Sequence, residues 1–146
     1  EFNKSWHRLS PWLDSIPGLT ELKNNFFVSA LSNGNLSMLI RLSKNSNIPW
    51  DSIISTELFG TYKPDPEVYL GAAKLLEIKT SESMMVASHA YDLDGAKMSG
   101  MKTCYIHRPN EFGNYKSENY GDLSRFDIVV ESIEEIREKI KIYKRG

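Results

Sequence analysis

Polar side chains follow three apolar runs of this sequence, and their types can bind and activate a small anion. Ser32 and Asn33 follow the first run, Lys63 comes after a second and weaker run, and Ser88 to Asp92 follow a third. A serine hydroxyl and loop amides can hold an anionic oxygen, and a lysine can neutralise or orient a carboxylate. An aspartate in the third group can fix that lysine or position a water molecule.

Each of these residues also has a purely structural interpretation. Ser32 can be a turn and capping residue, Lys63 a solvated surface lysine, and Asp92 a helix N-cap. His89 can be a general base, although a single loop histidine more often packs or forms a hydrogen bond. Tyr69 is expected to be half-buried in either case. The order and spacing of the three groups together favour a shared site.

Alternating strands and helices must bring these groups together. Apolar runs predict five strands, over 26–31, 52–56, 84–88, 103–106 and 127–130. The first of them is a continuous apolar run, which is typical of a strand buried on both faces. The pattern predicts an α/β fold with a parallel sheet, right-handed crossovers and helices on both faces. Ligands bind beyond the carboxyl ends of such strands, where the polar groups should converge.

Capping residues and apolar stripes predict the helices. Asn35 can cap a helix after the first strand, and Asp65 can cap a helix whose first residue is Pro66, where a missing amide hydrogen costs nothing. A helix capped by Asp92 should stop at Gly100. The remaining helical patterns are one over 18–25, one over 67–76 with Val68, Ala72 and Leu75 or Leu76 inward, and one with Ile133, Ile136, Ile140 and Tyr143 on one stripe.

The composition is that of an ordinary globular protein of one domain: 146 residues, 40% hydrophobic and 25% charged. A net charge of −1 with interspersed lysines and glutamates lacks the basic footprint of a nucleic-acid binder. No apolar stretch approaches the roughly 18 residues of a membrane span, and no signal pattern opens the sequence. We expect no nucleic-acid or membrane partner and a cytoplasmic location. The single cysteine, Cys104, is expected to be a buried, inert strand thiol.

Three motifs resemble those of the haloacid dehalogenase (HAD) superfamily. Its second motif is a Ser or Thr after an apolar strand, its third is a Lys, and its fourth is an acidic cluster after another strand. Here they read LSNGN, YKPDPEVY and VASHAYDLDGA. The resemblance covers nearly the whole chain and is closest to the type II L-2-haloacid dehalogenases, which show the same LSNG and KP-P-VY strings. It implies a Rossmann-like HAD core.

The resemblance implies a role for each residue of the first two groups and for two tyrosines. Ser32 would bind the substrate carboxylate and the nucleophile region, and Asn33 would form part of the halide cradle. Lys63 would hold the nucleophilic carboxylate, and Tyr69 would support that lysine. Tyr91 would be the apolar wall of the halide site.

The third group carries further implied roles and two departures from the family pattern. Asp92 would help to orient Lys63 and the hydrolytic water, beside Ser88 and His89. Ala87 stands where such dehalogenases usually have a Ser, and His89 stands where they usually have an Asn. Both departures concern the residues that would position the water.

The fourth motif also bears on the reaction class. Phosphatases of the superfamily carry a Gly-Asp pair whose Asp ligates Mg²⁺, and the aligned residues here are Ala87-Ser88. A site with one fewer carboxylate should hold this hard cation poorly. We therefore expect cofactor-free hydrolysis of a short 2-halo carboxylate to a 2-hydroxy acid. The alternatives are a Mg²⁺-dependent phosphatase, for which Asp94 can partly compensate, and a non-catalytic domain that binds a partner.

The family's nucleophilic Asp lies after a first strand that this sequence does not contain. In the family that strand is central, between the strands predicted here over 26–31 and 84–88. Residues 1–17 resemble the end of a cap region and a linker, and 18–146 resemble a partial core domain. We expect the chain to be part of a longer protein, to take the strand from a second fragment or a homodimer, or to have rearranged its fold to close the gap, and to be inactive alone.

Overall fold

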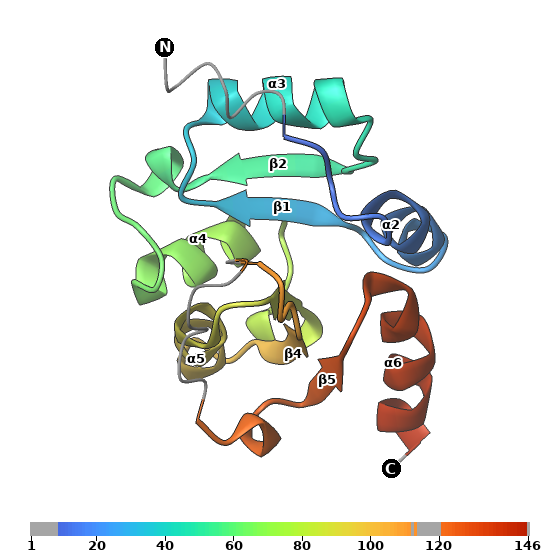
Figure 1. Ribbon diagram of the computed structural model, residues 1–146. Coiled ribbons are helices and arrows are strands. Elements are labelled where there is room, and N and C mark those ends of the chain that lie inside the picture. The colour runs from blue at the N-terminus through green and yellow to red at the C-terminus, as the bar shows by residue number, and fades with distance from the viewer. Residues whose placement is uncertain (1–8, 112, 114–120, 146) are drawn as a thin grey trace.

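The computed structural model describes residues 9–111, 113 and 121–145. It is an α/β fold of parallel strands and helices (Figure 1), as predicted. The strands are β1 (Ser29–Ser32), β2 (Ser52–Ser55), β3 (Met84–Ala87), β4 (Lys102–Ile106) and β5 (Ile128–Val130). The helices are α2 (Ser15–Lys23), α3 (Leu36–Ser46), α4 (Pro66–Leu75), α5 (Ala90–Met98) and α6 (Ile136–Arg145), with short 3-10 helices that include η2 (Thr56–Phe59) and η5 (Ile133–Glu135).

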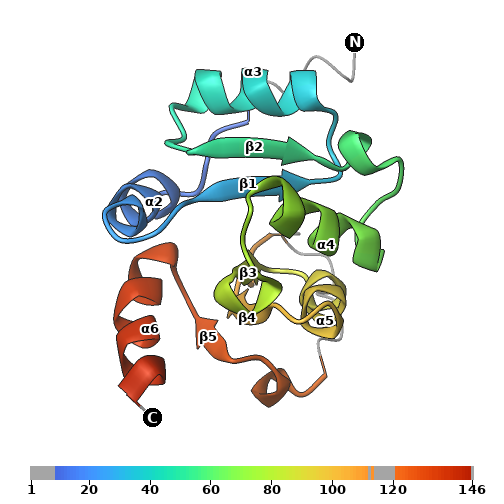
Figure 2. The same cartoon turned by 180° about the vertical axis from the view of Figure 1, so that it is seen from behind.

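The strands form two separate parallel sheets. One sheet pairs β1 with β2, and the other has the order β3-β4-β5. In both views β1 is the strand of the first sheet nearer to the second sheet (Figures 1 and 2). Within the described residues, β1 and β3 are each paired along one edge only. The prediction that the central strand between them is missing is therefore confirmed for this part of the chain.

The prediction for the first strand was wrong in its limits and its burial. The strand begins at Ser29 rather than at Phe26, and its four side chains are only partly buried. The amide of Phe26 donates to the carbonyl of Leu22, so the segment before the strand is still part of the turn that ends α2. Phe27 is 63% exposed. An apolar run does not by itself show where a helix end gives way to a strand.

The helices α2, α3 and α4 lie close to their predicted positions. Asn35 and Asp65 cap α3 and α4 as expected, and Pro66 is the first residue of α4. Helix α2 begins three residues before the predicted start at Gly18. In α4, Leu75 is exposed and Leu76 partly buried, so Leu76 is the one of the two predicted alternatives that faces inward.

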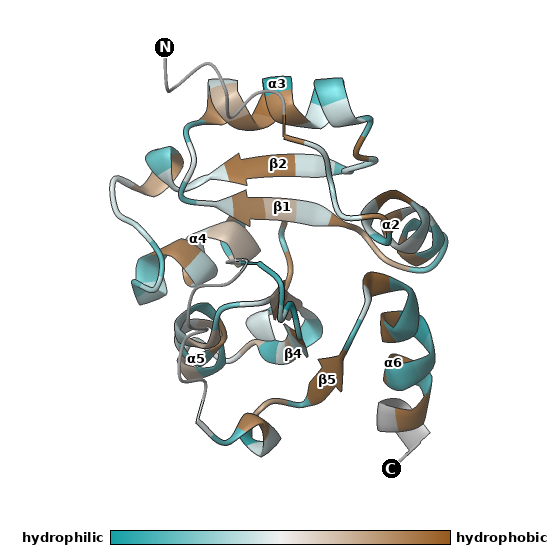
Figure 3. Ribbon diagram, in the orientation of Figure 1, coloured by the Kyte–Doolittle hydropathy of each residue, from teal (hydrophilic) through white to brown (hydrophobic). Residues whose placement is uncertain are grey.

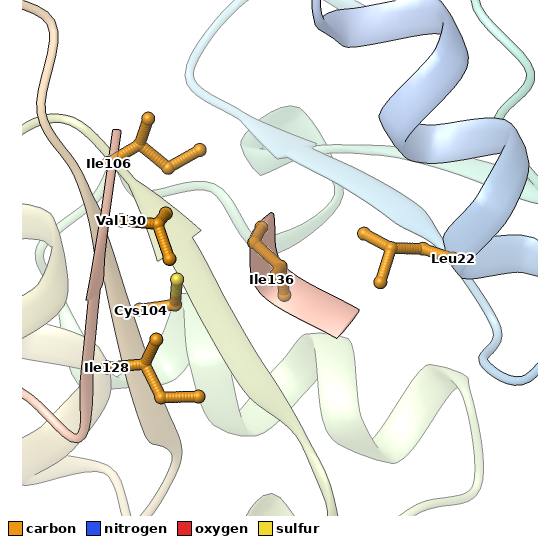
Figure 4. Packing of buried hydrophobic residues seen from close by; sticks show 6 residues of the cluster. All are labelled: Leu22, Cys104, Ile106, Ile128, Val130 and Ile136. Carbon is orange, nitrogen blue, oxygen red and sulfur yellow. The ribbon is translucent and has the colours of Figure 1, made fainter. Parts of the chain in front are cut away.

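The largest apolar cluster joins α2 and α6 to the second sheet. Figure 4 shows Ile136, the first residue of α6, between Leu22 of α2 and the strand side chains. Those strand side chains are Cys104, Ile106, Ile128 and Val130. Cys104 has no exposed surface, and burial raises the pKa of its thiol to about 12. The expectation of a buried, inert thiol is confirmed.

The last helix has the predicted amphipathic pattern. Ile136 is buried, Ile140 packs against the same cluster, and Ile133 joins them from η5. Figure 3 shows teal and brown residues interspersed along α6, whereas β5 is mostly brown. The side chain of Tyr143 lies outside the described residues. None of the helices in the described part of the chain is both long and apolar enough to cross a bilayer.

Asp14 ties the segment before α2 to the second sheet. Its carboxylate accepts two hydrogen bonds from Nη2 of Arg108, at 2.7 and 3.0 Å, and one from the amide of Ile133 at 2.7 Å. The Arg108 guanidinium also lies 4.9 Å from the centre of the Trp12 ring. Burial raises the pKa of Asp14, but these hydrogen bonds outweigh it and hold the pKa below its ordinary value.

Asp14→Asn tests this tie through the pH dependence of stability. A depressed folded-state pKa stabilises the fold above the ordinary Asp pKa of about 3.9, and this contribution is lost as the pH falls through the lower folded value. We expect the variant to lose about 1–3 kcal/mol at pH 7 and to lose stability less steeply on acidification. Urea unfolding at several pH values measures both effects. Glu134→Gln, at an exposed carboxylate, is the control, and an equal change in both variants would contradict the role of Asp14.

Candidate active site

A largely buried ion pair joins two of the three predicted groups. Lys63 Nζ lies 2.5 Å from Asp92 Oδ2, and the side chains are only 11% and 6% exposed. The interpretation of Lys63 as a solvated surface residue was therefore wrong. The N-cap interpretation of Asp92 was also wrong, because His89 is the N-cap of α5 and Asp92 lies within its first turn.

Tyr69 supports the pair from the Asp92 side. Its hydroxyl donates to Asp92 Oδ1 at 2.8 Å and lies 3.0 Å from the Asp92 main-chain oxygen. The side chain is fully buried, not half-buried as predicted, and its described hydrogen bonds reach Asp92 rather than Lys63. Burial and the Asp92 carboxylate raise the pKa of the phenol, so it remains a donor. The two oxygens of Asp92 thus have two different donors.

Asn33 fixes the main chain of Lys63. Its Oδ1 accepts from the Lys63 amide at 2.8 Å, and its Nδ2 lies 3.5 Å from the Lys63 carbonyl oxygen. The first and second predicted groups are therefore in direct contact. The side-chain amide of Asn33 positions the lysine loop, whatever else it binds.

Ser32 lies at the carboxyl end of β1 and forms the turn that leads into α3. Its Oγ accepts from the Gly34 amide at 3.1 Å, as the structural interpretation predicted. The Ser32 hydroxyl can still donate its own proton to a further acceptor. Glu57 Oε2 accepts from the Leu36 amide at 2.7 Å, so a side chain of the protein serves the first amide of α3.

The third group is linked to a residue that the sequence did not indicate. Glu111, in the loop after β4, accepts from Ser88 Oγ at 3.2 Å and lies 2.8 Å from His89 Nε2. The His89 ring stacks on Tyr91, with centroids 6.0 Å apart and planes 10° apart. Glu111 is 22 residues from His89 in a polar loop without a repeating pattern, so nothing in the sequence marked it.

Asp94 is not available as the extra metal ligand considered from the sequence. Arg125 donates to both of its oxygens, at 2.8 and 3.1 Å, and this interaction holds the pKa of Asp94 below its ordinary value. Ala87 and Ser88 offer no carboxylate in the position of the phosphatase aspartate. Over residues 9–111, 113 and 121–145, no three His, Cys, Asp or Glu side chains are grouped to hold a metal ion.

The arrangement can orient an anion beside Lys63. An ammonium group has three donors, and among the described residues Lys63 Nζ donates only to Asp92. Donors remain for a second carboxylate next to the pair. Tyr91, at 45% exposure, can provide an apolar surface in the first turn of α5.

Comparisons with known proteins find similar hydrolases. A family model for haloacid dehalogenase-like hydrolases matches residues 2–100. The chain is 38% identical over 114 residues to (S)-2-haloacid dehalogenase 1 of Pseudomonas sp. (strain CBS-3), covering 76% of this chain and 50% of that enzyme. It is 35% identical over 115 residues to (S)-2-haloacid dehalogenase 4A of Burkholderia cepacia, covering 77% and 50%. The chain thus spans about half the length of these relatives.

The fold also matches solved structures. A defluorinating L-2-haloacid dehalogenase superimposes with a TM-score of 0.89 and 38% identity, over 94% of this chain and 56% of the other. The strands and helices of this chain are therefore arranged as in that enzyme over most of this chain's length.

Tyr69→Phe tests the support of Asp92. Removal of the hydroxyl leaves a buried carboxylate oxygen without its donor, which costs about 1–3 kcal/mol of unfolding free energy. Urea unfolding followed by circular dichroism measures this loss. Tyr62→Phe, at a side chain that is 65% exposed, should change stability by much less. Equal effects of the two substitutions would contradict the role of the Tyr69 hydroxyl.

Gly95→Ala tests the close approach of α5 to the lysine loop. A Cβ at this position would lie 2.8 Å from Pro64 Cβ, 2.9 Å from the Pro64 carbonyl oxygen and 3.0 Å from Tyr69 Cε2. Overpacking of this kind costs about 1–3 kcal/mol, which exceeds the helix propensity that alanine adds. Thermal unfolding should show the loss. Met98→Ala, at an exposed position of the same helix, is the control; a Gly95→Ala variant as stable as the parent would show that the loop moves freely.

Proposed function

The chain belongs to the haloacid dehalogenase-like hydrolases, and from that premise we propose that the whole protein hydrolyses a short 2-halo carboxylate to a 2-hydroxy acid. The observation that carries the proposal is the buried pair of Lys63 and Asp92 with Tyr69 behind it. The names of the two curated relatives, both (S)-2-haloacid dehalogenases, support the substrate class.

The reaction proceeds in two displacements through a carboxylate nucleophile. An aspartate attacks C2 of the substrate, a C–O bond forms, the C–halogen bond breaks with inversion, and the halide leaves. Water then adds to the carbonyl carbon of this aspartyl ester. The acyl C–O bond breaks, the 2-hydroxy acid departs, a proton is released, and the carboxylate is restored.

The described residues have distinct roles in this scheme. Lys63 holds the attacking carboxylate through the donors that Asp92 does not use, and Asp92 helps to orient both Lys63 and the water. Ser32 binds the substrate carboxylate through its hydroxyl. Asn33 and Tyr91 form the halide site, and Asn33 keeps its contact with the Lys63 main chain.

The nucleophile must come from a strand between β1 and β3. A parallel strand in that position would form hydrogen bonds with the backbone groups at the inner edges of both strands. Each backbone donor or acceptor that is buried without a partner costs about 1–3 kcal/mol. Its carboxyl end would lie at the same edge of the sheet as Ser32 and Lys63. The strand can belong to another part of the same polypeptide or to a second fragment.

The two alternative functions are less well supported. Arg125 engages both oxygens of Asp94, so that carboxylate does not complete the Mg²⁺ site of a phosphatase. A domain that only binds a partner has no use for a buried lysine with unused donors beside an apolar wall. We therefore retain dehalogenation without a cofactor as the proposal.

Halide release from L-2-chloropropionate by the full-length protein tests the function. We expect release that is insensitive to a chelator and that falls about 10²–10³-fold in Lys63→Ala, because the attacking carboxylate loses its cationic partner. Lys74→Ala, at an exposed lysine of α4, should retain activity. A 2-fluoro acid extends the assay, since one solved relative is described as defluorinating.

The proposal fails if no 2-halo acid releases halide. Chelator-sensitive hydrolysis of a phosphomonoester, without halide release, would favour the phosphatase instead. Neither activity in a full-length protein that lacks an upstream aspartate would favour the partner-binding domain.

A further inference from the structure

A carboxylate from the loop after β4 links two neighbouring residues at the rim of the candidate site. We propose that Glu111 is a positioning residue that sets which 2-halo acids the site accepts, by holding His89 against Tyr91. This inference rests on the proposed function and extends it to a residue outside the three motifs.

The geometry gives Glu111 a defined hold on the loop after β3. One carboxylate oxygen accepts from Ser88 Oγ at 3.2 Å, and the other lies 2.8 Å from His89 Nε2. Two partners on the two oxygens fix the rotation of the carboxylate as well as its position. The His89 and Glu111 side chains are 33% and 24% exposed, so the link is shielded from bulk water more than a typical surface pair.

Glu111 contacts the His89 side chain from outside the helix that His89 begins. His89 is the N-cap residue of α5, yet its side chain makes no capping hydrogen bond. The imidazole instead extends toward Glu111, on the loop after the neighbouring strand β4. The carboxylate is therefore one of the contacts that fix the position of the imidazole ring.

The position of His89 in turn affects Tyr91. The two rings are stacked within 10° of parallel, at a centroid distance of 6.0 Å. Tyr91 is 45% exposed, so core packing restrains its ring less than it restrains Tyr69, which is fully buried. The stacking on His89 thus contributes to the orientation of the wall proposed for the halide.

Glu111 acts on fit and not on the attacking groups. Its described contacts are with Ser88 and His89, whereas Lys63, Asp92 and Tyr69 contact one another. Loss of Glu111 should therefore loosen the wall while the ion pair keeps its geometry. The predicted consequence is weaker discrimination between small and bulky substrates.

Kinetics of Glu111→Ala in the full-length protein test this inference. The ratio of kcat/KM for L-2-chlorobutanoate to that for chloroacetate should rise about three- to tenfold, a change expected when a pocket wall yields by about one methylene. Glu111→Gln retains an oxygen acceptor and an amide donor for the two partners, so it should restore a ratio close to that of the parent.

A second histidine and glutamate pair provides the matched control. His107 Nδ1 lies 3.2 Å from Glu131 Oε2, in the loops that follow β4 and β5. Glu131→Ala removes a carboxylate of the same type from a histidine that is not part of the proposed site. This variant should leave the substrate ratio unchanged, and an equal change in both alanine variants would overturn the inference.

Imidazole nitrogen NMR gives a readout that does not require activity. The sequence has three histidines, His7, His89 and His107, and a His89→Asn variant assigns the His89 signals. Glu111→Ala should shift the His89 signals and leave those of His107 unchanged, and Glu131→Ala should do the reverse. Unshifted His89 signals in Glu111→Ala would overturn the contact itself.

The outcomes separate this inference from the function on which it rests. Normal halide release by the parent with an unchanged substrate ratio in Glu111→Ala overturns the role of Glu111 alone. No halide release by the parent overturns the proposed function and the specificity role together, whatever the NMR signals show.

Discussion

The buried contact between Lys63 and Asp92 is the interaction on which the rest of the site depends. Removing two charges from water is costly unless each finds close partners, and leaving one of them alone is costlier still. Asp92 meets this requirement with two donors, Lys63 on one oxygen and Tyr69 on the other. The pair also crosses the molecule, because Lys63 follows the two-stranded sheet and Asp92 lies on the helix that packs against the three-stranded sheet. The same contact thus links the parts of the chain that carry the two sheets and assembles the site.

Contacts to the main chain of the lysine loop also help to fix the position of Lys63. The side-chain amide of Asn33 holds the main chain of Lys63 from the β1 side. On the other side, Gly95 lets α5 approach Pro64 so closely that a Cβ would overlap it. The lysine loop is confined between these two contacts, so its ammonium group has little freedom to leave Asp92.

The sequence predicted those features that follow from local rules. Parallel strands bring their carboxyl ends together, which is why Lys63 and Asp92 could be placed in one site, and Asp65 has the capping residue type that α4 requires. Features that depend on packing between distant segments were missed. The burial of Tyr69 arises where α4 meets α5, and Glu111 reaches His89 through a loop contact that no periodic pattern encodes.

Two features of the described residues lack a partner at the same end of the sheet, and one strand that ends in a carboxylate would complete both. The inner edges of β1 and β3 lack a neighbouring strand among these residues, and Lys63 has donors that Asp92 does not use. An apolar segment could cover a hydrophobic edge, but it would not provide a partner for the Lys63 ammonium group. The strand that fills this gap must also bring a negative charge to the carboxyl end of the sheet. Lys63 lies in low-dielectric surroundings, where its attraction to a second carboxylate is much stronger than the same attraction in water. A strand that ends in an aspartate meets the backbone requirement and the charge requirement at once, and it places that aspartate where the proposed chemistry needs its nucleophile.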